Sequence, residues 1–302
     1  MAASDGDGVS RSLTIDPRLD LATTVRGAKN PVLVGPTEAY WCTRTPEGTG
    51  ALSLQRTADD RVEATAWGAG AGWLLDQVPR LLGADDDPGG FAPSGRIGQL
   101  WRRSPFRLAR TDRPWDALVG AILGQKVQTA NAAQSRRALA RRFGDPAPGP
   151  RPAWILPSPD RVAGLGYHDL HPLRVERKRA EVLIRTAREM PRLAPVFADG
   201  DPARITERLA HVRGIGPWTA AMVTAVTVGD PDAVPVGDFH LPNTVAWLLA
   251  GEPRADDARM LELLEPYAGH RWRVLRLAKS STTAPRYGPR LSRRGDGLYL
   301  GR

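Results

Sequence analysis

The stretch that decides the fold is Leu209-Ala-His-Val-Arg-Gly-Ile-Gly-Pro-Trp-Thr-Ala-Ala-Met222. Its residues predict a helix that ends near Val212, a tight turn at Gly214-Ile-Gly216 and a second helix that begins at Pro217. The isoleucine between the glycines can point into the core and hold the turn. Backbone N–H groups then face outward at a helix N-terminus and form a concave site for one phosphate. Most Gly-x-Gly turns are plain loops, so the stretch needs support from its surroundings.

Apolar residues recur at helical spacing on both sides of this hairpin. The first stripe follows Pro114, and a Pro-rich loop is expected over residues 145–159. Further helices are expected over residues 130–143, 175–190, 202–212, 217–227, 242–250 and 255–266, and one short helix is expected earlier, over residues 71–79. The part of the chain after residue 98 therefore reads as helical.

The residues before 99 have a different pattern. Residues 51–56 and 62–67 alternate apolar and polar side chains, which predicts half-buried strands, with a turn at 45–50. Residues 85–90 are acidic and rich in Gly, with one Pro, which is typical of a linker.

We therefore expect an α+β protein in which an N-terminal domain with an antiparallel sheet precedes an all-helical domain of the helix-hairpin-helix type. The expected boundaries are a disordered N-terminus over 1–12, the α+β domain over 13–98, the helical domain over 99–283 and a basic tail over 284–302.

Composition excludes several classes of protein. The chain has 302 residues, of which 41% are hydrophobic and 25% charged, as in globular proteins with a real core. The single cysteine, Cys42, excludes a disulfide framework, a cysteine-held iron–sulfur cluster and a four-cysteine zinc site. The polar N-terminus lacks the apolar core of a signal peptide, and no apolar run approaches the ~18 residues of a membrane span.

We expect a monomer in the bacterial cytoplasm, associated with the nucleoid, without metal or cofactor.

Charge is distributed unevenly along the chain. The net charge is +9, but residues 1–98 carry 9 Lys/Arg against 13 Asp/Glu, whereas residues 99–302 carry 33 against 20. The positive electrostatic potential of such a basic region favours a polyanionic partner such as nucleic acid. The alternative is a solvated basic surface that binds nothing specific.

A second segment, Asp232-Ala-Val-Pro-Val-Gly-Asp-Phe-His240, follows the hairpin, and its Asp238 lies 20 residues beyond Trp218. Asp238 comes just before a helix that Pro242 is expected to open. Taken alone, Asp238 is an N-terminal cap worth about 1 kcal/mol, and His240 is a structural hydrogen-bonding group.

Three segments in order resemble the helix-hairpin-helix DNA glycosylase superfamily, and within it the 3-methyladenine DNA glycosylase II branch. They are residues 114–125, which end in a glutamine, residues 212–220 with the hairpin, and residues 236–240. The resemblance covers residues 112–280 strongly and residues 13–98 more loosely.

The resemblance implies a monofunctional glycosylase that flips alkylated bases, such as 3-methyladenine, out of double-stranded DNA and excises them in base excision repair. Asp238 would stabilise the oxocarbenium-like sugar and guide water, as carboxylates do in glycoside hydrolysis. Trp218 and Met222 would line the base pocket, with core packing as the alternative for both. The implied DNA-binding residues are Gln125, Lys126, Arg213, Gly214, Gly216 and Thr219.

Two departures from the family pattern bear on activity. Trp218 stands where bifunctional relatives place a Schiff-base lysine, which argues against lyase activity. Lys126 stands where the family often has an apolar wedge, which leaves the wedge role open. Two alternatives remain: a glycosylase for oxidised or deaminated bases, and a non-catalytic DNA-binding protein. Asp238 argues against the second, because a mere binder does not need that carboxylate.

Overall fold

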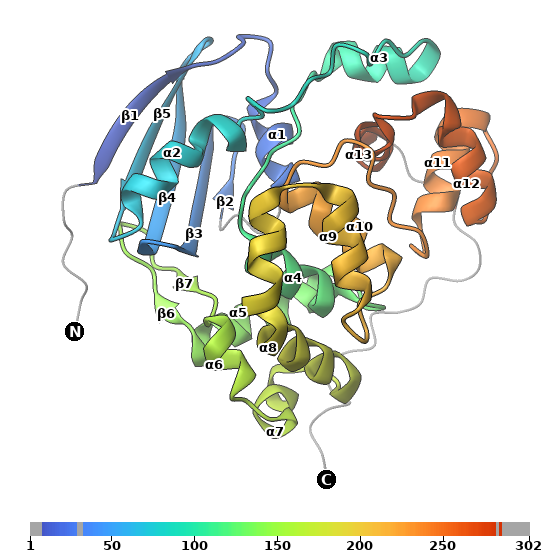
Figure 1. The fold of residues 1–302 in the computed structure, drawn as a ribbon. Helices are drawn as coiled ribbons and strands as arrows, with labels where there is room; N and C mark the ends of the chain where they lie inside the picture. Colours follow the sequence, from blue (N-terminus) through green and yellow to red (C-terminus); the bar gives the residue numbers. More distant parts are fainter. Residues whose placement is uncertain (1–7, 29–32, 282–283, 286–302) are drawn as a thin grey trace.

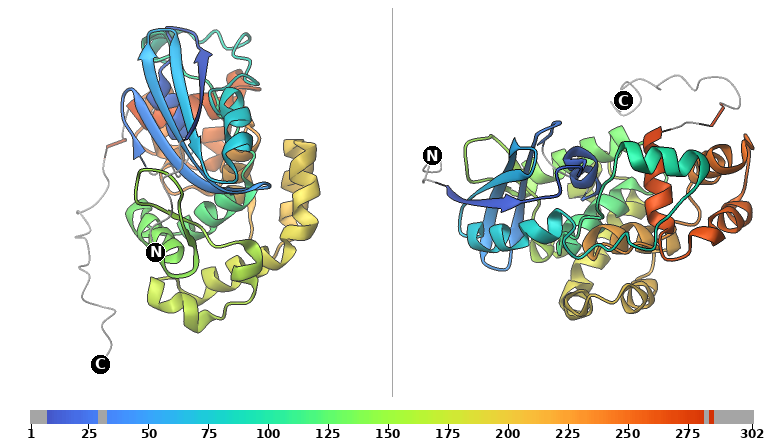
Figure 2. Two further views of the ribbon diagram at one scale, coloured as in Figure 1. Left: turned by 90° about the vertical axis from the view of Figure 1, so that its left-hand side faces the viewer. Right: turned by 90° about the horizontal axis from the view of Figure 1, so that it is seen from above.

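The protein, as a computed structural model, is described over residues 8–28, 33–281 and 284–285, which form a sheet and a helical part (Figure 1). The antiparallel sheet has the strand order β1-β5-β4-β3-β2. Its strands are β1 (Val9–Thr14), β2 (Leu33–Val34), β3 (Glu38–Thr45), β4 (Gly48–Ala58) and β5 (Arg61–Trp67). Two further views show the sheet at one end of the molecule and most of the helices beyond it (Figure 2). The predicted α+β fold class is confirmed.

The alternating residues form the strands that the sequence predicts. Leu52 and Leu54 of β4 are buried together with Val62 of β5, and they pack beneath α1 (Leu21–Gly27) and α2 (Ala71–Leu81). The turn between β3 and β4 is shorter than predicted. Thr45 pairs with Gly48, so only two residues connect the strands.

The N-terminal prediction is wrong for residues 9–12. These residues belong to β1, which pairs with β5 in a register that places Val9 opposite Ala66. An edge strand of this kind is held by backbone hydrogen bonds and needs few buried side chains, so its polar sequence resembled a disordered segment. Residues 1–7 and most of the basic tail, residues 286–302, lie outside the described residues.

The helical part agrees with the predicted periodicity over most of its length. The helices are α3 (Gly95–Arg103), α4 (Pro114–Gly124), α5 (Thr129–Phe143), α6 (Pro159–Ala163), α7 (Tyr167–Leu170), α8 (Arg177–Asp199), α9 (Pro202–Ala210), α10 (Pro217–Thr227), α11 (Leu241–Ala250), α12 (Asp257–Leu264) and α13 (Arg271–Ser281), with 3₁₀ turns at His171–Leu173 and Glu265–Tyr267. Helix α8 continues past the predicted end at residue 190, through Pro191 and Pro195, because Leu193 and Phe197 anchor its last turns in the core.

The predicted loop over 145–159 contains a short hairpin of β6 (Asp145–Pro146) and β7 (Trp154–Ile155). No described helix has both the length and the apolar character needed to cross a membrane.

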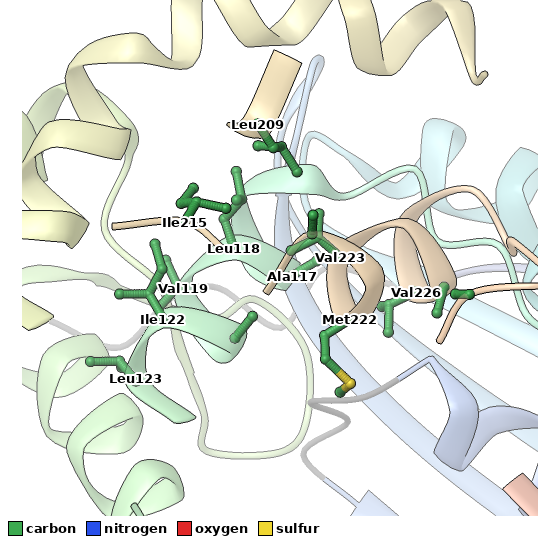
Figure 3. Packing of buried hydrophobic residues seen from close by; sticks show 14 of the residues in the cluster. Ala117, Leu118, Val119, Ile122, Leu123, Leu209, Ile215, Met222, Val223 and Val226 are labelled. Carbon is green, nitrogen blue, oxygen red and sulfur yellow. The ribbon is translucent and has the colours of Figure 1, made fainter. Parts of the chain in front are cut away.

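The core of the helical part lies between α4 and α10. Leu118 and Ile122 of α4 belong to the same buried cluster as Val223 of α10, and Ile215 of the hairpin turn lies among them (Figure 3). The turn is therefore fixed by packing on the helix that ends beside it.

The acidic segment 85–90, predicted as a linker, is bound tightly to the last helix. The carboxylate of Asp86 accepts hydrogen bonds from both terminal nitrogens of Arg273 at 3.0 and 2.7 Å, and also from the Leu108 backbone N–H at 3.0 Å. The Arg273 side chain is fully buried and lies over the Phe91 and Trp101 rings. This ion pair fixes α13 against the segment that joins the sheet to the helices.

Replacing Asp86 by Asn should destabilise the fold strongly, because it leaves the buried guanidinium without its counter-charge. We expect a loss of about 3 kcal/mol in the free energy of unfolding, measured by urea denaturation. The control is Asp85→Asn, since the Asp85 carboxylate is half-exposed and forms only longer ion pairs with Arg80 and Arg110. Equal losses in the two variants would contradict the role of the buried pair.

Candidate active site

The hairpin has the turn geometry that its sequence predicts. Helix α9 ends at Ala210, and Gly214 adopts a φ of +99° that favours glycine. A Cβ at Gly214 would lie 2.2 Å from Cγ2 of Val182, so the close approach to α8 also requires glycine. Gly216 is extended and caps α10, and a Cβ there would meet no atom within 4 Å. One glycine is thus required by packing, and the other leaves the surface of the turn open.

The first turn of α10 presents unpaired backbone donors at this open surface. Pro217 occupies the first helical position, and the N–H groups of Trp218 and Thr219 donate to no other described residue. These N–H groups lie at the positive end of the helix dipole. Donors in this position can bind an anion, and the contact with one phosphate group stays a prediction.

Gln125 connects the end of α4 to the hairpin. Its Nε2 donates to the Gly214 carbonyl oxygen and to the Thr219 hydroxyl, both at 3.0 Å. Thr219 is only 2% exposed, so the predicted contact of Thr219 with DNA would have to be made by its backbone N–H. The Thr219 hydroxyl accepts a hydrogen bond from Gln125, and only the backbone N–H of Thr219 remains available to a ligand.

Lys126, the residue after Gln125, is exposed and has a φ of +56°.

Asp238 lies between the hairpin and α11, and both of its oxygens are engaged. Oδ1 accepts the backbone N–H groups of His240 and Leu241 at 2.9 and 3.0 Å, and Oδ2 accepts the indole Nε1–H of Trp218 at 2.9 Å. The N-cap position of α11 is occupied by His240 and not by Asp238, so the predicted N-cap role is wrong in its position. Asp238 still accepts the N–H of Leu241, the first residue of the helix, and it also binds the hairpin helix through Trp218. Partial burial raises the pKa of Asp238, but the Trp218 indole, the two backbone donors and the charge of Lys279 outweigh it and lower that pKa below the ordinary value. The carboxylate is half-buried and ionised at neutral pH.

The two predicted pocket residues differ in their surroundings. Trp218 is half-buried, and its ring lies beside Gly124 at the end of α4, so it bridges α4 and Asp238. Met222 is 7% exposed and belongs to the helical core (Figure 3). This burial favours the core-packing alternative for Met222, and the pocket role stays a prediction.

Sequence reasoning missed three residues that support the site. The guanidinium of Arg185, on α8, donates to the Arg213 carbonyl oxygen at 2.6 Å, while the Arg213 side chain is exposed. Asp257, at the start of α12, accepts the Gly237 N–H at 3.0 Å and braces the loop before Asp238. Lys279 comes from α13, a helix that the sequence pattern did not predict. In the sequence, Gly237 was the available signal for a tight turn before Asp238.

Among the described residues, no group of three or more His, Cys, Asp or Glu side chains could hold a metal ion.

Comparison with known proteins agrees with this geometry. Residues 119–268 match the family described as HhH-GPD superfamily base excision DNA repair protein. The chain carries an HhH-GPD superfamily domain. The resemblance drawn from the three sequence segments is confirmed.

The curated relatives of this domain include enzymes for alkylated bases. A DNA-3-methyladenine glycosylase of Bacillus subtilis is 27% identical over 179 residues, which cover 53% of this chain and 57% of the relative. DNA-3-methyladenine glycosylase 2 of Escherichia coli is 32% identical over 129 residues, which cover 42% and 46%. The chain thus spans about half the length of the curated relatives it matches.

Solved structures with little sequence identity share the fold over most of the chain. A 3-methyladenine DNA-glycosylase from Archaeoglobus fulgidus has a TM-score of 0.76 at 14% identity and covers 89% of this chain and 97% of its own. An 8-oxoguanine glycosylase/lyase from Clostridium acetobutylicum, solved with double-stranded DNA, has a TM-score of 0.69 at 13% identity and covers 92% and 96%. The sheet and helices together therefore form the architecture that these glycosylases share.

Proposed function

We propose that this protein is a monofunctional DNA glycosylase that excises alkylated bases, such as 3-methyladenine, from double-stranded DNA. The single observation that carries this proposal is the ionised carboxylate of Asp238, held between the hairpin helix α10 and the start of α11. The curated relatives named for 3-methyladenine support the alkylated base as substrate.

Asp238 has the charge and the rigidity that this reaction needs. When the bond between base and sugar breaks, positive charge develops on the sugar. A carboxylate whose pKa is held low stays negative opposite that charge, and three hydrogen bonds fix its position before the reaction begins. The same carboxylate guides the water molecule that completes the hydrolysis. An alkylated purine is already cationic and leaves readily, so this chemistry needs no strong general acid.

Trp218 supports hydrolysis without a covalent intermediate. A lyase-competent enzyme attacks the sugar with an amine. Here the corresponding side chain of α10 is an indole that donates to Asp238 and carries no nucleophile. The reaction then ends at an intact abasic strand.

Asp238→Asn should lower the rate of base excision by roughly 10²-fold or more, because it removes the charge opposite the developing cation. The amide oxygen can still accept the two backbone N–H groups, but the amide NH2 cannot accept the Trp218 indole N–H. Urea denaturation of the variant therefore accompanies the rate measurement. Single-turnover excision of an alkylated duplex measures the effect. Asp256→Asn is the matched control, because Asn caps a helix as well as Asp and Asp256 caps α12. Near-normal excision by Asp238→Asn would refute the assignment.

Arg213→Ala should weaken binding to damaged and undamaged duplexes alike. Its exposed guanidinium lies at the hairpin, where a phosphate contact carries no sequence information. The plot of log affinity against log salt concentration should lose about one unit of slope. Arg18→Ala serves as control, since Arg18 is exposed but pairs with Asp16 before α1. A loss confined to damaged DNA would place Arg213 in the base pocket instead.

A further inference from the structure

Phe239 is the most exposed large apolar side chain among the described residues. It is 85% exposed, whereas Phe91, Phe106 and Phe197 are buried in the core. Isolated apolar side chains at a surface are common and need no special cause. The position and the rigid support of Phe239 are what set it apart.

The backbone around Phe239 is fixed on both sides. Asp238 Oδ1 accepts the N–H groups of His240 and Leu241, which closes a tight turn around Phe239. On the other side, Gly237 donates to Asp257 at 3.0 Å. The Phe239 ring also makes an edge contact with His240, with 4.9 Å between ring centroids and 87° between planes. An exposed aromatic ring is therefore presented from a rigid turn and not from a loose loop.

Phe239 is the immediate neighbour of the candidate catalytic carboxylate. Consecutive Cα atoms are about 3.8 Å apart, so a nucleotide whose sugar reaches Asp238 brings the adjoining duplex close to Phe239. Flipping that nucleotide leaves an unstacked gap in the duplex, and proteins that open such gaps often insert apolar side chains into them. An aromatic ring also stacks on any base, because every base has a π-face.

Lys126 is less suited to that gap. Its ammonium is exposed and strongly hydrated, and it comes directly after Gln125 at the end of α4. Phe239 can enter an apolar space without the loss of hydration that an ammonium suffers.

We infer that Phe239 stacks against a base of the duplex beside the flipped nucleotide and holds the gap open. The inference rests on the proposed function for the placement of the sugar at Asp238. The turn over residues 238–240 would then recognise the opened DNA in addition to holding the catalytic carboxylate.

The test compares binding to two duplexes of the same sequence, one undamaged and one with a tetrahydrofuran abasic-site analogue. Phe239→Ala should lose about tenfold in affinity for the analogue duplex and little for the undamaged one, because the stacking contact forms only where a base is missing. Phe239→Trp keeps an aromatic face and should retain the preference. Since Phe239 is exposed, thermal unfolding of both variants should match that of the wild type.

Trp154→Ala is the control for nonspecific contacts of an exposed aromatic ring. Trp154 is 45% exposed on β7, in the hairpin beside the sheet, and its loss should change neither affinity. Wild-type affinity of Phe239→Ala for the analogue duplex would overturn the inference, as would an equal loss on both duplexes. The analogue has no base to excise. A wild-type protein that prefers the analogue through Phe239 but excises no lesion would therefore contradict the proposed function and leave this inference standing.

Discussion

The hydrogen bond from the Trp218 indole to Asp238 joins the two segments on which the site depends. Trp218 belongs to the first turn of α10, so it moves with the hairpin, while Asp238 is tied by its other oxygen to the start of α11. The hairpin in turn is held by Ile215 in the core and by Gln125 at the end of α4. An unpaired N–H surface and an ionised carboxylate are thereby fixed in relation to one another before any ligand binds. Pre-organisation of this kind is what electrostatic catalysis requires.

The two interpretations of Asp238 that the sequence allowed describe the same geometry. The carboxylate accepts the N–H groups of His240, at the N-cap position, and of Leu241, the first residue of α11, and so stabilises the beginning of that helix. Those same bonds, with the indole, offset the effect of partial burial and keep the group charged. The contacts that stabilise the beginning of α11 therefore also keep the Asp238 carboxylate ionised. Substitutions of Asp238 need a measurement of folding beside every measurement of rate.

Local signals in the sequence predicted much of the fold and the centre of the site. Helix α10 occupies residues 217–227 as expected, because Pro217 and the glycines before it mark a boundary that needs no distant partner. The missed features depend on contacts far along the chain. The role of Thr219 depends on Gln125, 94 residues earlier, and the burial of Arg273 in α13 depends on Asp86, 187 residues earlier. An arginine in a helical stripe resembles a solvated residue until its counter-charge is known, so α13 and its Lys279 were not predicted. Polar β1 was missed for the same reason, since only its pairing with β5 reveals it.

The central claim is that this site removes damaged bases by hydrolysis. The most direct measurement incubates duplexes that each carry one defined lesion with the protein and then analyses the strands before and after alkali. Excision of 3-methyladenine or another alkylated base should leave an intact abasic strand that breaks only after alkali. Cleavage without alkali would contradict the monofunctional mechanism. The absence of abasic sites from every alkylated, oxidised and deaminated duplex, under conditions where the protein binds them, would contradict the account as a whole.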